Sequence, residues 1–152
     1  QLLNCGLGDG ARMVEQGELD AIHGFSGAPV GGLKELAQNQ PCQLLKYTQE
    51  ELEAILAENQ SYYPVVIPAG TYAGQEEDVD TFGVKCLLCV DASMSENLVY
   101  QITQEIWAAT EKLTKEHPAL AEMADREFVC QDLPIPLHLG AWEFYEDQGI
   151  LE

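Results

Sequence analysis

Short apolar stretches of strand character alternate with short helical patterns along the first half of the chain, and this alternation restricts the possible folds more than any other feature. The strands that we expect cover residues 19–25, 43–47, 62–68 and 79–90. The helices that we expect between them cover residues 11–16 and 29–38 and a segment opened by Thr48, where Glu51 completes a capping box. Strands that alternate with helices predict an α/β fold.

The second half of the chain is mostly helical. One helix is expected from a capping box of Ser93 and Glu96 to about Glu116, because Pro118 cannot continue it. Its apolar stripe comprises Leu98, Ile102, Ile106, Ala109 and Leu113. Further helices are expected over residues 119–128 and 139–147.

The charge is strongly acidic, with 26 Asp and Glu against 7 Lys and Arg and a net charge of −19 over 152 residues. This balance argues against nucleic acid, whose phosphates require a basic surface, and against docking on anionic lipid. The sequence has no apolar run of the roughly 18 residues that insertion into a membrane requires. The remaining partners are small molecules or other proteins.

No enzyme motif is recognisable, so we expect no catalytic residues, no metal and no cofactor. His23, His117 and His138 are widely spaced, and packing or capping suits His117 and His138 better than a role as general base. Ser26 has no local partner that would make it a nucleophile. Cys86 and Cys89 have C-x-x-C spacing inside an expected strand, where the two thiols would point to opposite faces. Buried apolar roles are therefore expected for them, with redox or metal chemistry as the alternative.

The first candidate for ligand binding follows the strand expected over residues 19–25. Ligands of open α/β sheets bind beyond the carboxyl ends of strands, and a loop that enters a helix offers free backbone N–H groups. Glycines let the backbone approach a ligand, and an aromatic ring supplies an apolar wall. The candidate residues are Gly24, Phe25, Ser26, Gly27, Ala28 and Pro29, the last placed in the first turn of the helix. An ordinary turn between strand and helix is the alternative.

A second candidate comprises Gly70, Thr71 and Tyr72 in a glycine-bearing loop, with Thr81 on the following strand. Basic side chains are few, so an anionic ligand would depend on backbone dipoles and hydroxyl groups. A flexible loop with a hydroxyl cap is the alternative.

An ordered series of short motifs resembles the TAXI family, the solute receptors of tripartite ATP-independent periplasmic (TRAP) transporters. The series covers nearly the whole chain and matches the C-terminal portion of family members. It comprises Gly17-Glu18-Leu19-Asp20-Ala21, Gly27-Ala28-Pro29, Ile67-Pro68-Ala69-Gly70-Thr71-Tyr72, Asp78-Val79-Asp80-Thr81, Glu96-Asn97-Leu98-Val99-Tyr100-Gln101-Ile102-Thr103, and Pro136-Leu137-His138-Leu139-Gly140-Ala141 with Tyr145 and Gly149.

The resemblance implies a periplasmic-binding-protein-like (type II) α/β architecture with an incomplete two-lobe fold. Residues 1–77 would form part of the ligand-binding lobe, and residues 78–152 would supply a crossover strand and helices that pack on the other lobe. The implied function is a non-enzymatic periplasmic receptor that delivers a small carboxylate or an amino acid such as glutamate to a TRAP permease. No signal peptide is recognisable from Gln1 onward. A stand-alone dimeric interaction or sensor domain, in which two chains bury open strand edges, is the alternative.

Overall fold

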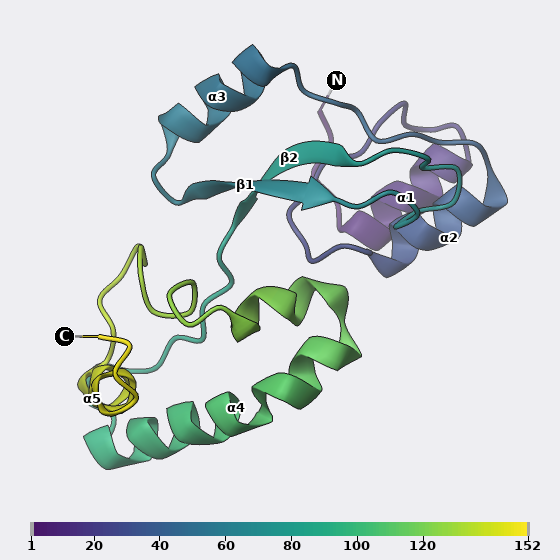
Figure 1. Ribbon diagram of the computed structural model, residues 1–152. Helices are drawn as coiled ribbons and strands as arrows, with labels where there is room; N and C mark the ends of the chain where they lie inside the picture. Colours follow the sequence, from purple (N-terminus) through teal and green to yellow (C-terminus); the bar gives the residue numbers. More distant parts are fainter. Residues whose placement is uncertain (1, 152) are drawn as a thin grey trace. The chain divides into compact units, whose positions relative to one another are not determined.

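The computed structural model describes residues 2–151 and divides the chain into two compact units, Gln1–Val84 and Lys85–Glu152 (Figure 1). The first unit contains helices α1 (Leu7–Glu15), α2 (Gly31–Asn39) and α3 (Gln49–Glu58), followed by strands β1 (Tyr62–Ile67) and β2 (Val79–Val84). The second contains α4 (Glu96–Glu116), the 3₁₀ helix η1 (Pro118–Ala124) and α5 (Leu139–Asp147). Helices and strands together make the mixed α/β content that the sequence predicts.

Strands β1 and β2 form an antiparallel hairpin in which Tyr62 pairs with Val84 and Ile67 with Val79. Since side chains alternate along a strand, Tyr62 and Phe82 lie on one face of the hairpin and Thr81 lies on the other. The expected strand over residues 79–90 therefore ends early, at Val84. It ends there because Tyr62, the partner of Val84, is the first residue of β1.

Residues 19–25 and 43–47 form no strand, so these two strand predictions were wrong. A β-strand needs a neighbour to accept its backbone hydrogen bonds, and the one sheet in the described residues is the β1–β2 hairpin. The first of these segments packs against α1 instead. A Cβ atom added to Gly10 would overlap Ile22, and one added to Gly24 would overlap Leu7.

Glycines also let α1 and α2 approach closely. A Cβ atom at Gly32 would lie 3.2 Å from the Cα atom of Gly8. Ala11 and Leu36 are buried in this unit, at 3% and 5% exposure. Helix α2 begins after Val30, so Pro29 lies outside the helix and not in its first turn as predicted.

The predicted capping box of α3 is confirmed. The Thr48 hydroxyl accepts a hydrogen bond from the Glu51 amide at 3.2 Å, and the Glu51 carboxylate accepts one from the Thr48 amide at 2.8 Å. The Thr48 backbone N–H, followed by the Thr48 hydroxyl, holds the pKa of Glu51 below its usual value of 4.5. This cap fixes the entry into α3, whose Leu52 is buried.

A carboxyl group with a lowered pKa in the folded state contributes stability above its unfolded pKa and loses that contribution as the pH falls. We therefore expect Glu51→Gln to lower the unfolding free energy at pH 7, and the difference from the wild type to shrink as the pH drops below 4.5. Urea unfolding followed by far-ultraviolet circular dichroism measures it. Glu50→Gln, in the same helical turn, is the control. A difference that is constant with pH would contradict the role of the ionised cap.

In the second unit, Phe144 of α5 is 2% exposed and contacts Tyr100 and Trp107 of α4, with ring centroids 5.4 and 6.0 Å apart. The long helix and its end at Glu116 agree with the sequence. Its apolar stripe is only partly covered, because Leu98 remains 46% exposed and Ile106 36% exposed.

Two local predictions for this unit were wrong. Ser93 does not cap α4, because its hydroxyl and amide both donate to the Asp91 carboxylate and the helix begins later, after Ser95. The helix expected over residues 119–128 is a short 3₁₀ helix followed by turns. The Asp125 carboxylate accepts from the amides of Glu127 and Phe128, and this local bonding competes with a continuous helix.

Lys85, the first residue of the second unit, fixes the turns that follow η1. Its ammonium group donates to the carbonyl oxygens of Phe128 at 2.9 Å and Gln131 at 2.8 Å. It also lies 4.3 Å from the centroid of the Phe128 ring. One side chain thus satisfies two backbone acceptors and adds a cation–π contact.

Helices α4 and α5 meet at Gly140. A Cβ atom there would overlap the carbonyl oxygen of Glu96 and lie 2.9 Å from the amide nitrogen of Tyr100. Both are backbone atoms at the start of α4, so they cannot rotate away as a side chain would. Glycine is therefore required at this crossing.

Gly140→Ala should destabilise the second unit by about 2–3 kcal/mol, because the added methyl group forces α5 away from α4. Trp107 and Trp142 both belong to this unit, so urea unfolding followed by tryptophan fluorescence reports on it. Gly8→Ala is the control, since a Cβ atom there meets nothing within 4 Å. Equal stability of Gly140→Ala and the wild type would show that the two helices are not in close contact.

Much apolar surface remains uncovered. The chain exposes 10794 Å², whereas two separate domains that share its 16.7 kDa would expose about 9,200 Å² together. The most exposed large apolar residues include Leu45, at 75% exposure, and Leu88, at 72%. None of the helices in residues 2–151 combines the length and the hydropathy needed to cross a bilayer.

Candidate functional site

The loop that the sequence singles out, residues 24–29, is accessible in the first unit. Gly24, Ser26 and Gly27 are exposed, and Phe25 is 48% exposed. Ala28 and Pro29 are half-buried and joined by a cis peptide bond. No side chain caps the amides at the start of α2.

The loop between β1 and β2 is held by the side chain of Gln75. Its amide nitrogen donates to the carbonyl oxygens of Ile67, Pro68 and Glu77, each at 3.0 Å. Its carbonyl oxygen accepts from the Tyr72 amide at 3.3 Å. The side-chain amide of Gln75 therefore closes the loop around Tyr72.

The predicted residues Gly70 and Thr71 serve the same loop. The Gly70 amide donates to the Gln75 carbonyl at 2.9 Å, and its φ of 79° suits glycine. The Thr71 hydroxyl donates to the Pro68 carbonyl at 2.6 Å. Both residues therefore shape the turn in the structure, and their contact with a solute stays a prediction.

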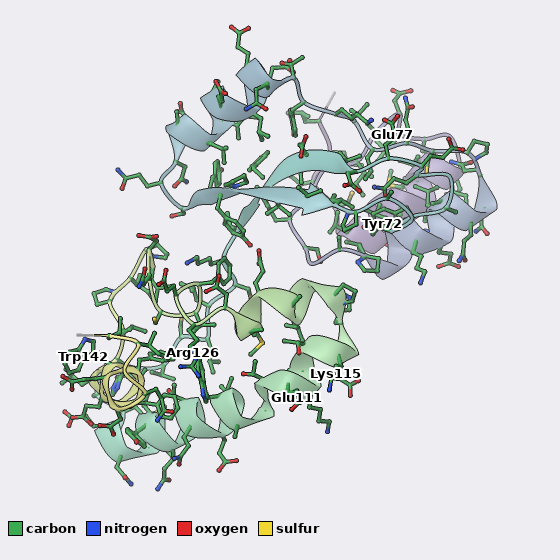
Figure 2. The ribbon with its side chains drawn as sticks, viewed as in Figure 1. Tyr72, Glu77, Glu111, Lys115, Arg126 and Trp142 are labelled. Atoms are coloured by element: carbon green, nitrogen blue, oxygen red, sulfur yellow. The ribbon has the colours of Figure 1, made fainter. Side chains whose placement is uncertain are left out.

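Tyr72 joins this loop to the first candidate segment. Its side chain is 8% exposed, and its hydroxyl oxygen accepts a hydrogen bond from the Val30 amide at 3.0 Å (Figure 2). Val30 directly follows Pro29 and precedes α2. The structure thus brings the two predicted segments together, although they are separated by about forty residues of sequence.

Thr81 is placed differently. It pairs with Val65 across the hairpin, whereas Phe25 contacts Phe82 on the opposite face, with ring centroids 5.5 Å apart. The hairpin therefore separates the Thr81 side chain from the Phe25 ring.

An aromatic cluster surrounds Phe25. The Tyr62 ring stacks on the Phe25 ring, and the His23 ring meets it edge-on. The ring centroids are 6.2 and 5.6 Å from that of Phe25. The ring centroid of Phe82 lies 5.0 Å from that of Tyr62 and 5.9 Å from that of Tyr47. We call these residues the aromatic cluster: His23, Phe25, Tyr47, Tyr62 and Phe82.

Ion pairs flank the loops. Lys46 donates to the Glu77 carboxylate at 2.5 Å, and this hydrogen bond, with the charge of the ammonium group, lowers the pKa of Glu77. Arg12 pairs with Asp9 at 2.7 Å. Two of the three basic groups of the first unit are therefore already matched with carboxylates.

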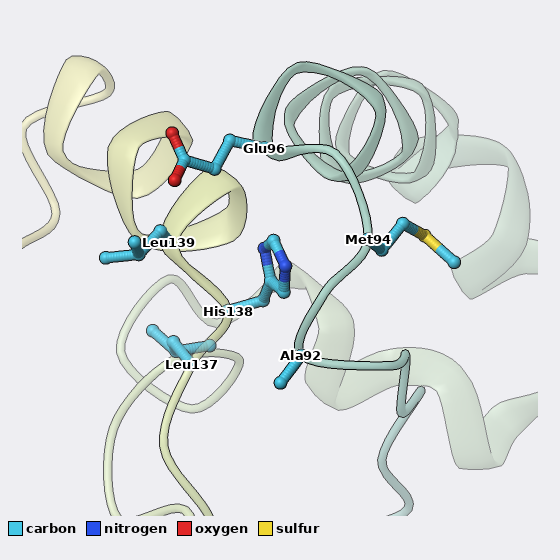
Figure 3. Close-up of a pocket in the computed structure, with 6 residues that line it drawn as sticks. All are labelled: Ala92, Met94, Glu96, Leu137, His138 and Leu139. Atoms are coloured by element: carbon cyan, nitrogen blue, oxygen red, sulfur yellow. The ribbon is translucent and has the colours of Figure 1, made fainter.

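The second unit contains a hollow of about 200 Å³ beside His138 (Figure 3). The imidazole Nδ1 accepts from the Gly140 amide at 3.2 Å and so caps α5, which agrees with the predicted capping role. In Figure 3 the Met94 side chain points away from the imidazole, and the Glu96 carboxylate lies above Leu139. These polar ends do not converge on one point.

A wider groove of about 590 Å³ lies in the same unit. Cys130, Pro136, Trp142 and Leu151 are among its lining residues, which are almost entirely apolar. Burial raises the pKa of the Cys130 thiol, which disfavours the reactive thiolate. Within residues 2–151, no group of three or more His, Cys, Asp or Glu side chains is arranged to hold a metal ion.

Sequence reasoning missed Gln75 and the members of the aromatic cluster other than Phe25. The glycines of residues 69–75 predicted a loop that includes Gln75, but they did not predict that its side chain reaches three backbone carbonyls. The aromatic residues come from separate segments, and only folding brings them together.

These features define an α/β protein with accessible loops and with ionisable groups that serve caps, turns and ion pairs. The chain matches the NMT1-like family over residues 1–149. It therefore belongs to the NMT1-like family, whose members have a periplasmic-binding-protein-like fold. The fold class and the general role of a binding protein, both expected from the sequence, are confirmed at this level.

We expect Tyr72→Phe to loosen the contact between the two loops, because the Val30 amide loses its acceptor. The cost should be about 1 kcal/mol of unfolding free energy. Amide hydrogen exchange by NMR measures the effect directly at Val30, whose protection should fall. Tyr47→Phe, which leaves the hydrogen bond to Val30 in place, is the control. Unchanged exchange at Val30 in Tyr72→Phe would exclude the role assigned to the hydroxyl.

Proposed function

We propose that this chain acts in a solute receptor of the TAXI type, which takes up a small carboxylate or an amino acid such as glutamate and delivers it to a TRAP permease. It works outside the cytoplasm and without catalysis. Residues 1–77 contribute to the ligand-binding lobe, and residues 78–152 contribute the crossover strand and the helices of the other lobe.

One observation carries the proposal. The exposed segment 24–27 leads into the uncapped amides of α2, and the Val30–Tyr72 hydrogen bond holds this place against the hairpin loop. Exposed amides and the Ser26 hydroxyl bind a carboxylate without changing it chemically. The membership in a binding-protein family supports the same reading.

Calorimetry with a panel of amino acids and small carboxylates tests the proposal. At least one solute should bind, and at a concentration 100-fold above its Kd it should add about 2.7 kcal/mol to the unfolding free energy. Ser26→Ala should weaken that solute about three- to tenfold by removing one hydrogen bond. Ser61→Ala, in the turn before β1, is the control. A panel without any binding, or equal affinity in Ser26→Ala, would contradict the proposed site.

A dimeric interaction or sensor domain is the second candidate. The observation that favours it is the exposed apolar surface at Val66 and Val84 of the hairpin, which pairing of two chains would cover. The net charge of −19 opposes such pairing by self-repulsion. Light scattering at low and at high salt distinguishes the candidates, since a stable dimer in the absence of solute supports only this one.

A further inference from the structure

The Phe25 ring combines exposure with aromatic support. Nearly half of its surface is open to solvent, while three rings of the cluster contact it: Tyr62 stacked, and His23 and Phe82 edge-on. An exposed phenylalanine on a loop is ordinarily free to turn. Here the neighbouring rings fix its orientation, so its accessible surface is preorganised.

The first unit as a whole carries a large negative charge. The first unit contains thirteen acidic and three basic side chains. Asp80 lies on the same face of β2 as Phe82, two residues away, and is exposed. The faces of aromatic rings carry negative partial charge as well, so both kinds of group attract the same class of ligand.

The second unit shows how this chain fills an aromatic face with its own cations. Lys85 lies over Phe128, and Arg126 lies 5.7 Å from the Trp107 ring. In the first unit, Arg12 and Lys46 are instead paired with Asp9 and Glu77. Among the described residues, the recorded cation–ring contacts lie in the second unit and none involves a ring of the aromatic cluster.

We propose that the aromatic cluster is a binding subsite for an organic ammonium group, with Phe25 and Tyr62 as its aromatic wall. The inference rests on the proposed function, according to which the ligand is a transported solute. It narrows the chemical class of that solute. Among small carboxylates, those that also carry an ammonium group are preferred, because the ammonium charge offsets one carboxylate in a unit with thirteen acidic and three basic side chains.

Glutamate and glutarate test the preference, since they differ only in the ammonium group. Calorimetry should give tighter binding of glutamate. Phe25→Leu, which keeps the apolar bulk but removes the π face, should weaken glutamate about two- to fivefold and leave glutarate unchanged. Phe25→Tyr, which retains the π face, is the matched control and should bind as the wild type does. Equal or tighter binding of glutarate would overturn the inference while leaving the proposed receptor function intact.

A second experiment tests the ammonium subsite without a carboxylate in the ligand. Titration with tetramethylammonium chloride, followed by NMR of the ring protons, should shift Phe25 and Tyr62 more than sodium chloride does at the same ionic strength. The Tyr62 shift should shrink in Phe25→Leu and persist in Phe25→Tyr. Ring shifts with tetramethylammonium support the subsite even where the solute panel shows no binding, and then the proposed function alone fails. Identical responses to the two salts overturn the subsite.

Discussion

The hydrogen bond from the Val30 amide to the Tyr72 hydroxyl is the contact on which the candidate site depends. It connects the start of α2 with the loop between β1 and β2, and Gln75 in turn fixes that loop through three backbone carbonyls. Because the Tyr72 side chain is buried, the bond is protected from competing water. The exposed residues before Pro29 are therefore attached to a rigidly held position, and such preorganisation favours ligand binding.

Close backbone contacts at glycines organise the rest of each unit. Gly32 allows α1 and α2 to touch, and Gly140 allows α5 to cross the start of α4. Such contacts are specific but bury little apolar area. This explains how well-defined helices coexist with exposed side chains such as Leu98 and Leu139. Surface of that kind is typical of sites where another protein or another part of a protein packs.

Local signals in the sequence predicted the elements that depend on local physics. The capping box at Thr48, the end of α4 before Pro118 and the α5 helix over Leu139–Asp147 all follow from nearby residues. The strands over residues 19–25 and 43–47 were not predictable in this way, because strand formation depends on a distant partner. Residue 79 onward was extended as expected, but the length of β2 is set by Tyr62 on β1.

The candidate site was predictable in its segments and not in its assembly. Glycine and serine before a helix indicated an accessible loop, and the structure shows that loop exposed. The bond between Val30 and Tyr72 joins residues 42 positions apart, which no local pattern reveals. The face on which Thr81 lies depends on strand register, and a shift of one residue would reverse it.

Lys85 marks the boundary between the two units. It follows the last residue of β2 directly, and its ammonium group is bonded to the turn that contains Phe128 and Gln131. No slack polypeptide separates the end of the hairpin from this anchor. The side chain of Lys85 therefore ties the chain to the second unit at the first residue of that unit.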